Sequence, residues 1–596
     1  MRVLFASLCA ALAIGSAALA QQTADAVQPE GATTGALTAI SPAVAQALAA
    51  KEAGVPVEAD TWMVAAANPH AVEAGAAVLR RGGTAADALV AVQAVLGLVE
   101  PQSSGLGGGA FLVWYDAETG QLTTLDGRET APLAVTPRLF QNADGTPKKF
   151  FDAVVGGLSV GTPGTPALLQ AAHTRWGALN WARLFDDAIA LAEDGFAVSP
   201  RLAGLVARDA ERLMRFDSTR AYFLPGGTPI TAGVTLRNAD YADTLRLIAA
   251  HGAEGFYTGE IAADIVDVVQ SAPGNPGVLS EVDLAIYQVK ERAPVCAQYR
   301  GHDVCGMGPP SSGALTVGQI LGMLNTHDLA ALGPDSPDAW RLIGDASRLA
   351  FADRGRYMAD SDFVPMPTAG LVAPSYLGER AELLRGDTAL SEVAPGTPSW
   401  DHARLWADDD SIELPSTSHI TIVDAAGNVA SMTTTIENAF GARLMVRGFL
   451  LNNELTDFSF RTHRDGVPIA NRIEPGKRPR SSMAPTIVMK DGAPVLAIGS
   501  PGGSRIIGYV AKSIIAWADW GMDVQQAVSL GHAVNRFGVF DLEEGSAMAS
   551  LDAPLTEMGF DVNIRGLNSG LHAIEIGDTL KGGADPRREG IALGNR

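Results

Sequence analysis

The segment HITIVDAAGNVASMTTT, residues 419–435, contains two runs of apolar and β-branched residues. Such runs are typical of β-strands. Between them, residues 425–428 read AAGN, and glycine and asparagine are residues that tight turns readily accept. The segment therefore predicts an antiparallel hairpin with strands at 419–423 and 429–435.

A second hairpin and a helix are predicted further along the chain. Residues 486–489 and 495–498 are apolar runs on either side of Asp491-Gly492, a dipeptide that favours a tight hairpin turn. Residues 500–503, SPGG, then lead into a segment with apolar residues at helical spacing, namely Ile506, Ile507, Val510, Ile514 and Ile515.

Two consecutive helices are predicted upstream of the first hairpin. Residues 68–69, Asn-Pro, form an N-cap and first-turn signal, and residues 80–82, Arg-Arg-Gly, are typical of a helix end. Thr84 and Asp87 have the spacing of a capping box, which would open a second helix that runs to about Val99.

The remaining pattern places these elements in a layered α+β fold. Strands are predicted at 110–115 and 121–125 around a turn that contains Gly120, and the spacing over 165–270 is mostly helical. Residues 395–416 show no regular period. Hairpins and helices with little βαβ alternation predict an α+β sandwich.

Composition excludes several classes of protein. The chain has 596 residues, 66 acidic and 44 basic, which gives a formal net charge of −22. A nucleic acid would be repelled by this charge, and the sequence contains no basic run that offsets it. Glycine and proline are too few for a collagen or a low-complexity chain.

The first residues are typical of an export signal. In residues 1–20, Arg2 precedes an apolar stretch, and residues 18–20 read ALA, a small-x-small cleavage site. No later run reaches the ~18 apolar residues of a membrane span. We therefore expect an exported protein, periplasmic or secreted, without a membrane partner. Residues 21–61 lack a sustained period and are interpreted as a loose leader.

Two cysteines remain after such a signal is removed, Cys296 and Cys305. If residues 300–301, Arg-Gly, form a two-residue hairpin turn, the two cysteines face each other at a non-hydrogen-bonded pair, where Cα atoms are close. Exported proteins oxidise such pairs, so a disulfide is predicted. Two unpaired buried thiols are the alternative.

Several familiar catalytic motifs are missing. The sequence has no HExxH, no CxxC and no GxxxxGK[ST], which disfavours zincins, thiol redox enzymes and P-loop enzymes. Residues 157–161, GLSVG, fit a nucleophile elbow in letters, but a loop-like TPG follows instead of a helix. Residues 105–109, GLGGG, lead into a strand, whereas a dinucleotide-binding loop must open a helix.

Ten short segments between residue 62 and the C-terminus carry a stronger signal. In chain order they are Glu100-Pro101-Gln102 with the glycine run after it, Asp126-Gly127-Arg128-Glu129, Phe256-Tyr257-x-Gly259-x-Ile261-Ala262, Tyr299-Arg300-Gly301, Pro309-Pro310-Ser311-Ser312-Gly313, Thr417-Ser418-His419, Asn452-Asn453-Glu454, Arg478-Pro479-x-Ser481-Ser482, Ser500-Pro501-Gly502-Gly503-Ser504-Arg505 and Asp585-Pro586-Arg587. Together they resemble the gamma-glutamyltransferase (glutathione hydrolase) family of N-terminal-nucleophile enzymes.

The resemblance implies a precursor that cuts itself between Ser416 and Thr417. A threonine hydroxyl is a weak nucleophile until a base takes its proton. Cleavage would give Thr417 its own α-amine, whose ordinary pKa of ~7.7–8.0 leaves a useful neutral fraction. By the same resemblance, Gly502 and Gly503 would form an oxyanion hole with backbone N–H groups, and Thr435 would position the nucleophile.

The resemblance also implies a binding site for a γ-glutamyl group. Arg128 would bind its α-carboxylate, because a guanidinium fits a carboxylate with two parallel donors. Ser481 and Ser482 would complete that carboxylate site. Glu454 and Asp457 would take the α-ammonium group.

One position departs from the family pattern. Glu437 stands where the family commonly carries asparagine, so the pocket would hold three acids if Glu437 faces the substrate amine. Extra negative charge favours an ammonium and disfavours a nearby carboxylate, so the acyl donor could differ from glutathione. Alternatively, Arg443 or Arg447 neutralises one of the acids.

These inferences predict an αββα sandwich, built jointly from a large subunit, residues 62–416 with the leader before it, and a small subunit, residues 417–596. The two chains would form a heterodimer that transfers a γ-glutamyl group from a small-molecule donor to water or to an amine, with no metal or organic cofactor. The nearest rival is an acylase of the cephalosporin (glutaryl) type. A non-catalytic protein that binds amino acids or peptides is the rival from another class.

Overall fold

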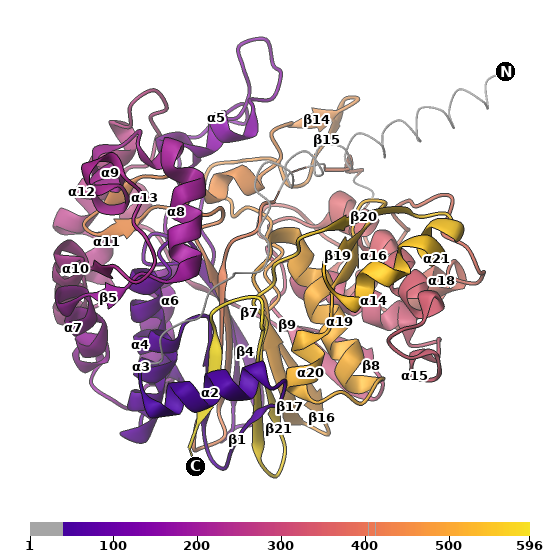
Figure 1. Ribbon diagram of the computed structural model, residues 1–596. Helices are drawn as coiled ribbons and strands as arrows, with labels where there is room; N and C mark the ends of the chain where they lie inside the picture. Colours follow the sequence, from indigo (N-terminus) through magenta and orange to yellow (C-terminus); the bar gives the residue numbers. More distant parts are fainter. Residues whose placement is uncertain (1–39, 403–404, 410, 412, 596) are drawn as a thin grey trace.

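Two antiparallel sheets of seven strands each form the centre of the structure (Figure 1). The structure is a computed structural model that describes residues 40–402, 405–409, 411 and 413–595. The first sheet has the order β1 (Val57–Ala59), β22 (Leu580–Ala584), β21 (His572–Ile576), β17 (Ala493–Gly499), β16 (Thr486–Lys490), β9 (His302–Gly306) and β8 (Val295–Tyr299). The second has the order β23 (Ile591–Gly594), β2 (Met63–Ala66), β10 (Ser418–Val423), β11 (Val429–Thr435), β3 (Gly109–Asp116), β4 (Gln121–Gly127) and β7 (Lys290–Arg292).

Helices cover the outer face of each sheet, so the fold has four layers (Figure 1). The helices on the second sheet include α3 (Pro69–Arg80), α4 (Ala85–Val99), α6 (Thr165–Trp176), α7 (Asp186–Asp194), α8 (Pro200–Leu213), α10 (Ala239–His251) and α12 (Gly259–Gln270). Those on the first sheet include α14 (Gly313–Leu324), α16 (Pro337–Tyr357), α18 (Pro374–Glu382), α19 (Ile506–Ala518) and α20 (Val524–Ser529).

The alternation of side chains along the strands builds three apolar layers. On β3, Leu112 and Trp114 pack against the helices of the second sheet, whereas Val113 lies between the two sheets. On β16, Ile487 lies between the sheets and Val488 faces the helices of the first sheet. Successive strand residues point to opposite faces, so strands with two apolar faces must lie inside a stack of layers. The predicted α+β, αββα architecture is confirmed.

The locally predicted elements are also confirmed. Strands β10 and β11 pair as the expected hairpin, and β16 and β17 pair around Asp491 and Gly492, which both have positive φ. Helix α4 begins with the capping box between Thr84 and Asp87. The described residues of 395–416 form no helix or strand, and they contain one isolated bridge, from Ala407 to Ile469.

The interpretation of residues 21–61 as a loose leader is wrong for residues 40–61. Helix α2 (Pro42–Glu52) begins at the N-cap Ser41, and its Lys51 ammonium donates to the carbonyls of Arg588 and Gly590 at 2.9 and 2.7 Å. Strand β1 pairs with β22. The acceptors of Lys51 and the strand that pairs with β1 lie more than 500 residues away in sequence, so no local pattern could reveal them. Residues 1–20, the expected export signal, lie outside the described residues.

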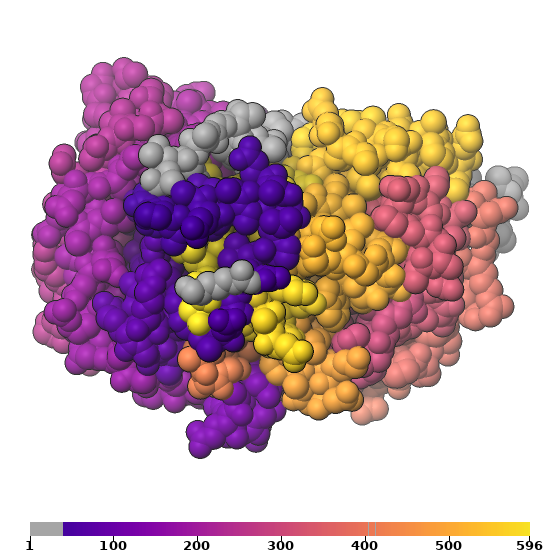
Figure 2. Space-filling view, turned by 60° about the horizontal axis from the view of Figure 1, so that its bottom comes forward, coloured from indigo at the N-terminus to yellow at the C-terminus, as the bar shows by residue number. Residues whose placement is uncertain are grey.

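Figure 2 shows the result of this pairing, since residues from near both ends of the described chain lie side by side on one face. Strand β23 at the C-terminal end also pairs with β2, close to the N-terminal end. The N-terminal segment is therefore part of the sandwich. Among the described residues, no helix combines the length and the apolar character needed to cross a bilayer.

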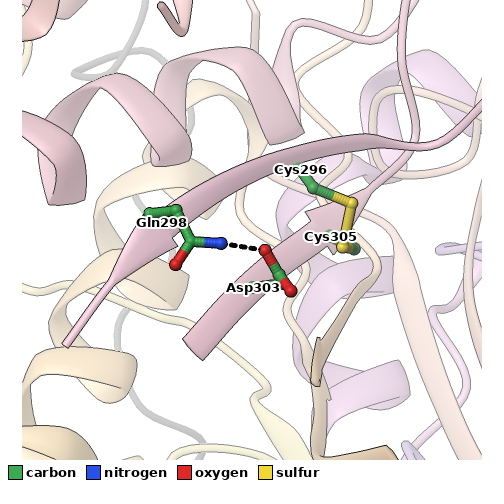
Figure 3. Close-up of a disulfide and its surroundings, with 4 residues drawn as sticks. All are labelled: Cys296, Gln298, Asp303 and Cys305. Atoms are coloured by element: carbon green, nitrogen blue, oxygen red, sulfur yellow. Dashed lines mark hydrogen bonds between the residues drawn. A yellow bond between two sulfur atoms is a disulfide. The ribbon is translucent and has the colours of Figure 1, made fainter. Parts of the chain in front are cut away.

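The structure joins Cys296 and Cys305 by a disulfide across the β8–β9 hairpin (Figure 3). Residues 300–301 form the turn with positive φ at both positions, and the two cysteine Cα atoms lie 4.1 Å apart. The amide of Gln298 donates to the carboxylate of Asp303 on the same hairpin.

The docking of helix α2 generates a stability prediction. Val44 is fully buried and Ala45, the next residue, is exposed. Val44→Asp should lower the free energy of unfolding by at least about 2 kcal/mol, the burial energy of a valine side chain. Ala45→Asp is the matched control and should change it by less than about 0.5 kcal/mol. Urea unfolding of both variants measures the free energy of unfolding. If the two substitutions change it equally, helix α2 does not pack against the rest of the protein.

Candidate active site

Thr417 lies immediately before β10, a central strand of the second sheet, and is 4% exposed. Its φ is +94°, a conformation that β-branched residues rarely adopt. Such a residue costs on the order of 1–3 kcal/mol and persists only where its surroundings hold it. The backbone is therefore strained at the Ser416–Thr417 peptide bond.

The hydroxyl of Thr417 faces another threonine hydroxyl across the hairpin. Thr417 Oγ1 lies 3.0 Å from Thr435 Oγ1 at the end of β11, and either oxygen can be the donor. Thr435 Oγ1 also accepts a hydrogen bond from the Glu437 N–H at 2.9 Å. The register, in which Ser418 is opposite Thr434, brings the two threonines together.

The carbonyl on the other side of the strained bond has a backbone donor. The Gly502 N–H donates to the Ser416 oxygen at 3.3 Å. Gly502 follows β17 and precedes α19, so the positive end of that helix lies close by. A donor in this position would stabilise negative charge on the Ser416 oxygen. Gly503 lines the same pocket, where an added Cβ would come within 2.8 Å of the Leu414 oxygen.

Further contacts fix the chain on both sides of the bond. Ser416 Oγ donates to the Gln102 carbonyl at 3.0 Å, and Arg588 donates to the Thr417 carbonyl at 3.1 Å. Ser418 Oγ donates to Glu100 at 3.1 Å. The Glu100-Pro101-Gln102 segment therefore supports the backbone around Thr417.

A small pocket opens beside Thr417. Its lining residues are Arg128, Glu413, Leu414, Thr417, Thr435, Glu437, Glu454, Asp457, Ser481, Ser482, Met483, Gly503 and Ile506. The structure thus brings the binding residues expected from the sequence to one place. Glu413 and Leu414, from the segment before the strained bond, were not expected there.

Arg128 is buried, and its donors are already used within the protein. Its guanidinium pairs with the carboxylates of Glu454 and Asp457 and donates to the backbone oxygens of Pro479 and Arg480 at 3.2 and 2.8 Å. From the resemblance, Arg128 was expected to bind a substrate carboxylate, and the two acids a substrate ammonium. In this structure they bind each other, because opposite charges at such depth must be paired.

Glu437 faces the pocket with positive φ, and neither neighbouring arginine neutralises it. Arg443 pairs with Asp209 and Arg447 with Asp264, so that alternative is wrong. The Glu437 carboxylate accepts from the Asn453 amide and from the Leu414 N–H.

Burial keeps protons on this acidic cluster. It raises the pKa of Glu437, Glu454 and Asp457 well above the ordinary values, with neighbouring carboxylates adding to the effect. Burial also raises the pKa of Glu129 to about 8, although Arg128 opposes the shift.

The two serines occupy different environments. Ser481 Oγ accepts the Met483 N–H at 3.1 Å, which shapes the loop. Ser482 Oγ donates to the carboxylate of Glu413 and accepts from Arg354 at 2.7 Å. Ser482 thus binds a carboxylate of the chain itself, and its expected role toward a substrate carboxylate stays a prediction.

Sequence reasoning missed three charged residues of this region, namely Glu413, Arg354 and Arg480. Arg480 occupies the unassigned position of the Arg478-Pro479-x-Ser481-Ser482 segment, and Glu413 is the acidic residue four positions before Thr417. No short motif contains all three, because they come together only in the fold.

The fold has four layers of helix and sheet, and a buried threonine lies at the start of a central strand. A backbone N–H donates to the carbonyl of the residue before that threonine. These are the features of an N-terminal-nucleophile hydrolase. The gamma-glutamyltranspeptidase family model matches residues 71–595. The chain belongs to this family, which confirms the resemblance seen in the sequence.

Individual relatives include two kinds of enzyme. Glutathione hydrolase proenzyme of Bacillus subtilis (strain 168) is 38% identical over 546 residues, covering 89% of this chain and 91% of that protein. Acylase ACY 1 proenzyme of Pseudomonas sp. (strain SE83) is 34% identical over 547 residues, covering 90% and 94%. The crystal structure of cephalosporin acylase from Bacillus halodurans has a TM-score of 0.80 at 25% identity, covering 91% of this chain and 97% of that chain.

The raised pKa of Glu129 generates a prediction on stability and pH. Its carboxyl loses a proton near pH 4.5 in the unfolded chain but near pH 8 in the folded one. The folded state therefore binds more protons between these values, and the free energy of unfolding falls as pH rises from about 4.5 to 8. Glu129→Gln should remove a few kcal/mol of this fall, since one pKa unit is worth about 1.4 kcal/mol.

Urea unfolding from pH 4.5 to 8.5 measures this effect. The chain with Glu129 and the chain with Glu129→Gln both carry Thr417→Ala, so that the bond between residues 416 and 417 stays intact in each. Exposed Glu118→Gln is the control and should leave the pH dependence unchanged. If the free energy of unfolding depends on pH in the same way with and without the Glu129→Gln substitution, the Glu129 carboxyl does not stay protonated in the folded chain.

Proposed function

We propose that the chain cuts itself between Ser416 and Thr417 and then uses Thr417 as the N-terminal nucleophile of a γ-glutamyl hydrolase and transferase. The activity follows from membership of the gamma-glutamyltranspeptidase family. The assignment of Thr417 rests on the geometry of the strained Ser416–Thr417 bond. The Thr417 hydroxyl follows this bond, and the Gly502 N–H donates to the Ser416 carbonyl oxygen before it.

In the first reaction the chain is its own substrate. Thr417 Oγ1 attacks the carbonyl carbon of Ser416, and negative charge develops on the oxygen that Gly502 faces. The C–N bond breaks, the Thr417 nitrogen gains the hydroxyl proton, and an ester joins Ser416 to Thr417 Oγ1. Water then hydrolyses this ester and leaves a Ser416 carboxylate and a free α-amine on Thr417. Relief of the strained φ favours the forward direction.

In the second reaction the same hydroxyl attacks an external amide. The α-amine of Thr417 takes the hydroxyl proton, and Oγ1 adds to the γ-carbonyl of the donor. The amide amine leaves with a proton, and a γ-glutamyl ester of Thr417 remains. Water or an amine acceptor then releases the acyl group. An oxyanion donor such as the Gly502 N–H is typically worth about 10²–10³ in rate.

The acidic pocket favours a γ-glutamyl donor over a glutaryl one. The two acyl groups differ in the α-ammonium, which only the γ-glutamyl group carries. The raised pKa of Glu437, Glu454 and Asp457 shows that negative charge in this pocket lacks enough positive charge to balance it, and an ammonium group there would favour their carboxylate forms and pair with them. Acylase chemistry, for which the Pseudomonas relative is named, is the second candidate. Rates with γ-glutamyl and glutaryl anilides separate the two functions.

After cleavage, residues 417–596 form a small subunit of 180 residues that remains paired with the large one. Each sheet contains strands from both sides of the cut, and they pair with one another at several places, such as β2 with β10 and β11 with β3, which supports a stable heterodimer. The sequence of residues 1–20 supports export, and we place the enzyme in the periplasm or outside the cell.

Thr417→Ala tests the nucleophile. Wild type should give two fragments on a denaturing gel, with an intact mass for the smaller one that begins at Thr417. Thr417→Ala should stay whole, because no hydroxyl is left to attack, and Thr417→Ser should still cut. Cleavage of the alanine variant at the same bond would remove Thr417 from this role.

Thr435→Val tests the second hydroxyl. This variant keeps the shape of the residue but removes the oxygen 3.0 Å from Thr417 Oγ1, so self-cleavage should slow by about 10-fold or more. Thr434→Val is the matched control, because the buried Thr434 hydroxyl has no hydrogen-bond partner among the described residues. The fraction of cut chain against time measures both, and equal rates would contradict the positioning role of Thr435.

A further inference from the structure

Thr417 would lose one of its two covalent links to the chain when the Ser416–Thr417 bond is cut. It lies outside the ladder between β10 and β11, in which the first pair is Ser418 with Thr434. In the described part of the chain, two side chains form hydrogen bonds with Thr417. Thr435 meets its Oγ1 at 3.0 Å, and Arg588 Nη1 donates to its carbonyl oxygen at 3.1 Å. These contacts would have to hold the new terminal residue in place.

The register of the second sheet explains how Arg588 reaches Thr417. Strand β2 lies between β10 and β23, and Ala66 of β2 is opposite both Ile420 and Ile591. Both pairings are antiparallel, so β10 and β23 run parallel to each other and begin at the same edge of the sheet. The residues before β23 therefore lie near the residues before β10, and Arg588 is buried there.

The backbone around Arg588 is held by a residue from the other end of the chain. The Lys51 ammonium, in the last turn of helix α2, donates to the carbonyls of Arg588 and Gly590 at 2.9 and 2.7 Å. Figure 2 shows α2 beside the C-terminal residues. Helix α2 precedes residue 71, where the match to the family model begins. An element outside that match thus fixes the loop whose arginine binds Thr417.

The guanidinium on the Thr417 carbonyl would also act on the α-amine that cleavage creates. The amine and the carbonyl are attached to the same Cα, so Arg588 lies close to both. A nearby positive charge disfavours an ammonium and lowers the pKa of the amine. More of the amine is then neutral at a given pH, and the neutral form is the one that accepts the Thr417 hydroxyl proton.

Other charged and titratable groups surround Thr417 and Arg588. Glu100 accepts the Ser418 hydroxyl proton at 3.1 Å, and its charge is balanced by Arg201 at 3.4 Å. The groups that line the pocket are Arg128, Glu413, Glu437, Glu454 and Asp457, and those around Arg588 and Lys51 are Asp585, Glu589 and His572. Within the described residues, Arg588 is the cation that forms a hydrogen bond with Thr417 itself.

We propose that Arg588 is a positioning residue for the nucleophile, that Lys51 of helix α2 holds it in place, and that its charge favours the neutral α-amine of Thr417. This inference rests on the proposed function, because the α-amine exists only after cleavage between Ser416 and Thr417. It gives the segment before residue 71 a part in the reaction.

The first test compares Arg588→Met with Arg588→Lys in the cut enzyme. kcat/KM for γ-glutamyl-p-nitroanilide should rise with pH as the α-amine loses its proton. Arg588→Met removes the charge, so the midpoint of this rise should move to higher pH by about 0.5 unit or more. Arg588→Lys keeps the charge and should stay within about 0.2 unit of wild type. A wild-type midpoint in Arg588→Met would overturn the proposal.

The second test changes the support of Arg588 and leaves the buried arginine in place, so it does not depend on the folding of Arg588→Met. Lys51→Met removes the donor to the two carbonyls and keeps an unbranched side chain. kcat should fall by about 5-fold or more while KM stays within about 2-fold, because the nucleophile is displaced and the binding residues are not.

Glu52→Gln is the matched control for Lys51→Met. Glu52 is the next residue of α2 and is exposed, so this variant should keep the wild-type kcat and KM. If Lys51→Met and Glu52→Gln have the same kcat, Lys51 does not hold the nucleophile and the proposal is wrong.

The double variant shows whether Lys51 acts through Arg588. Adding Lys51→Met to Arg588→Met should lower kcat by less than about 2-fold, because the contact that Lys51 supports is already lost. A further loss of about 5-fold would show an independent effect and contradict the proposal. All rates are expressed per cut chain, so that slower self-cleavage does not change them. A wild-type chain that stays uncut or inactive would instead overturn the proposed function.

Discussion

The pairing of β10 with β11 is the constraint on which the site depends. It sets the ends of the two strands against each other, so that the hydroxyls of Thr417 and Thr435 meet at 3.0 Å. The glycine run before β3 allows this, because a Cβ on Gly108 would lie 1.9 Å from the Thr435 carbonyl oxygen. A run that superficially resembles a nucleotide loop is therefore required by the close approach of one backbone to another.

Buried charge is the second determinant of the site. One arginine, Arg128, is shared by Glu454 and Asp457, while Glu437 and Glu129 lie near it with raised pKa values. Desolvation of so many carboxyl groups favours their protonated forms. An ammonium group in the pocket would favour the carboxylate forms instead, and this is the physical basis for the proposed preference for a γ-glutamyl donor.

The sequence predicted what is decided locally and missed what is decided by distant contacts. The Thr84–Asp87 capping box and the β8–β9 hairpin with its facing cysteines involve residues within about ten positions of each other. Helix α2 and strand β1 were missed, because their partners lie near the other end of the chain. The residues expected to bind substrate were identified because the sequence segments that contain them resemble those of a known family. The spacing of these residues along the chain did not indicate a common site.

The ion pair of Glu413 with Arg354 shows why some contacts of the site appear only in the folded chain. Each residue alone reads as an ordinary charge, on a helix or in a loop, and in the fold the two side chains form a buried pair beside the acidic pocket. The uncut chain also sets the Ser416 carbonyl on the Gly502 amide. Because the proposed self-cleavage and the proposed turnover both develop negative charge on a carbonyl oxygen, one backbone amide can serve the two reactions.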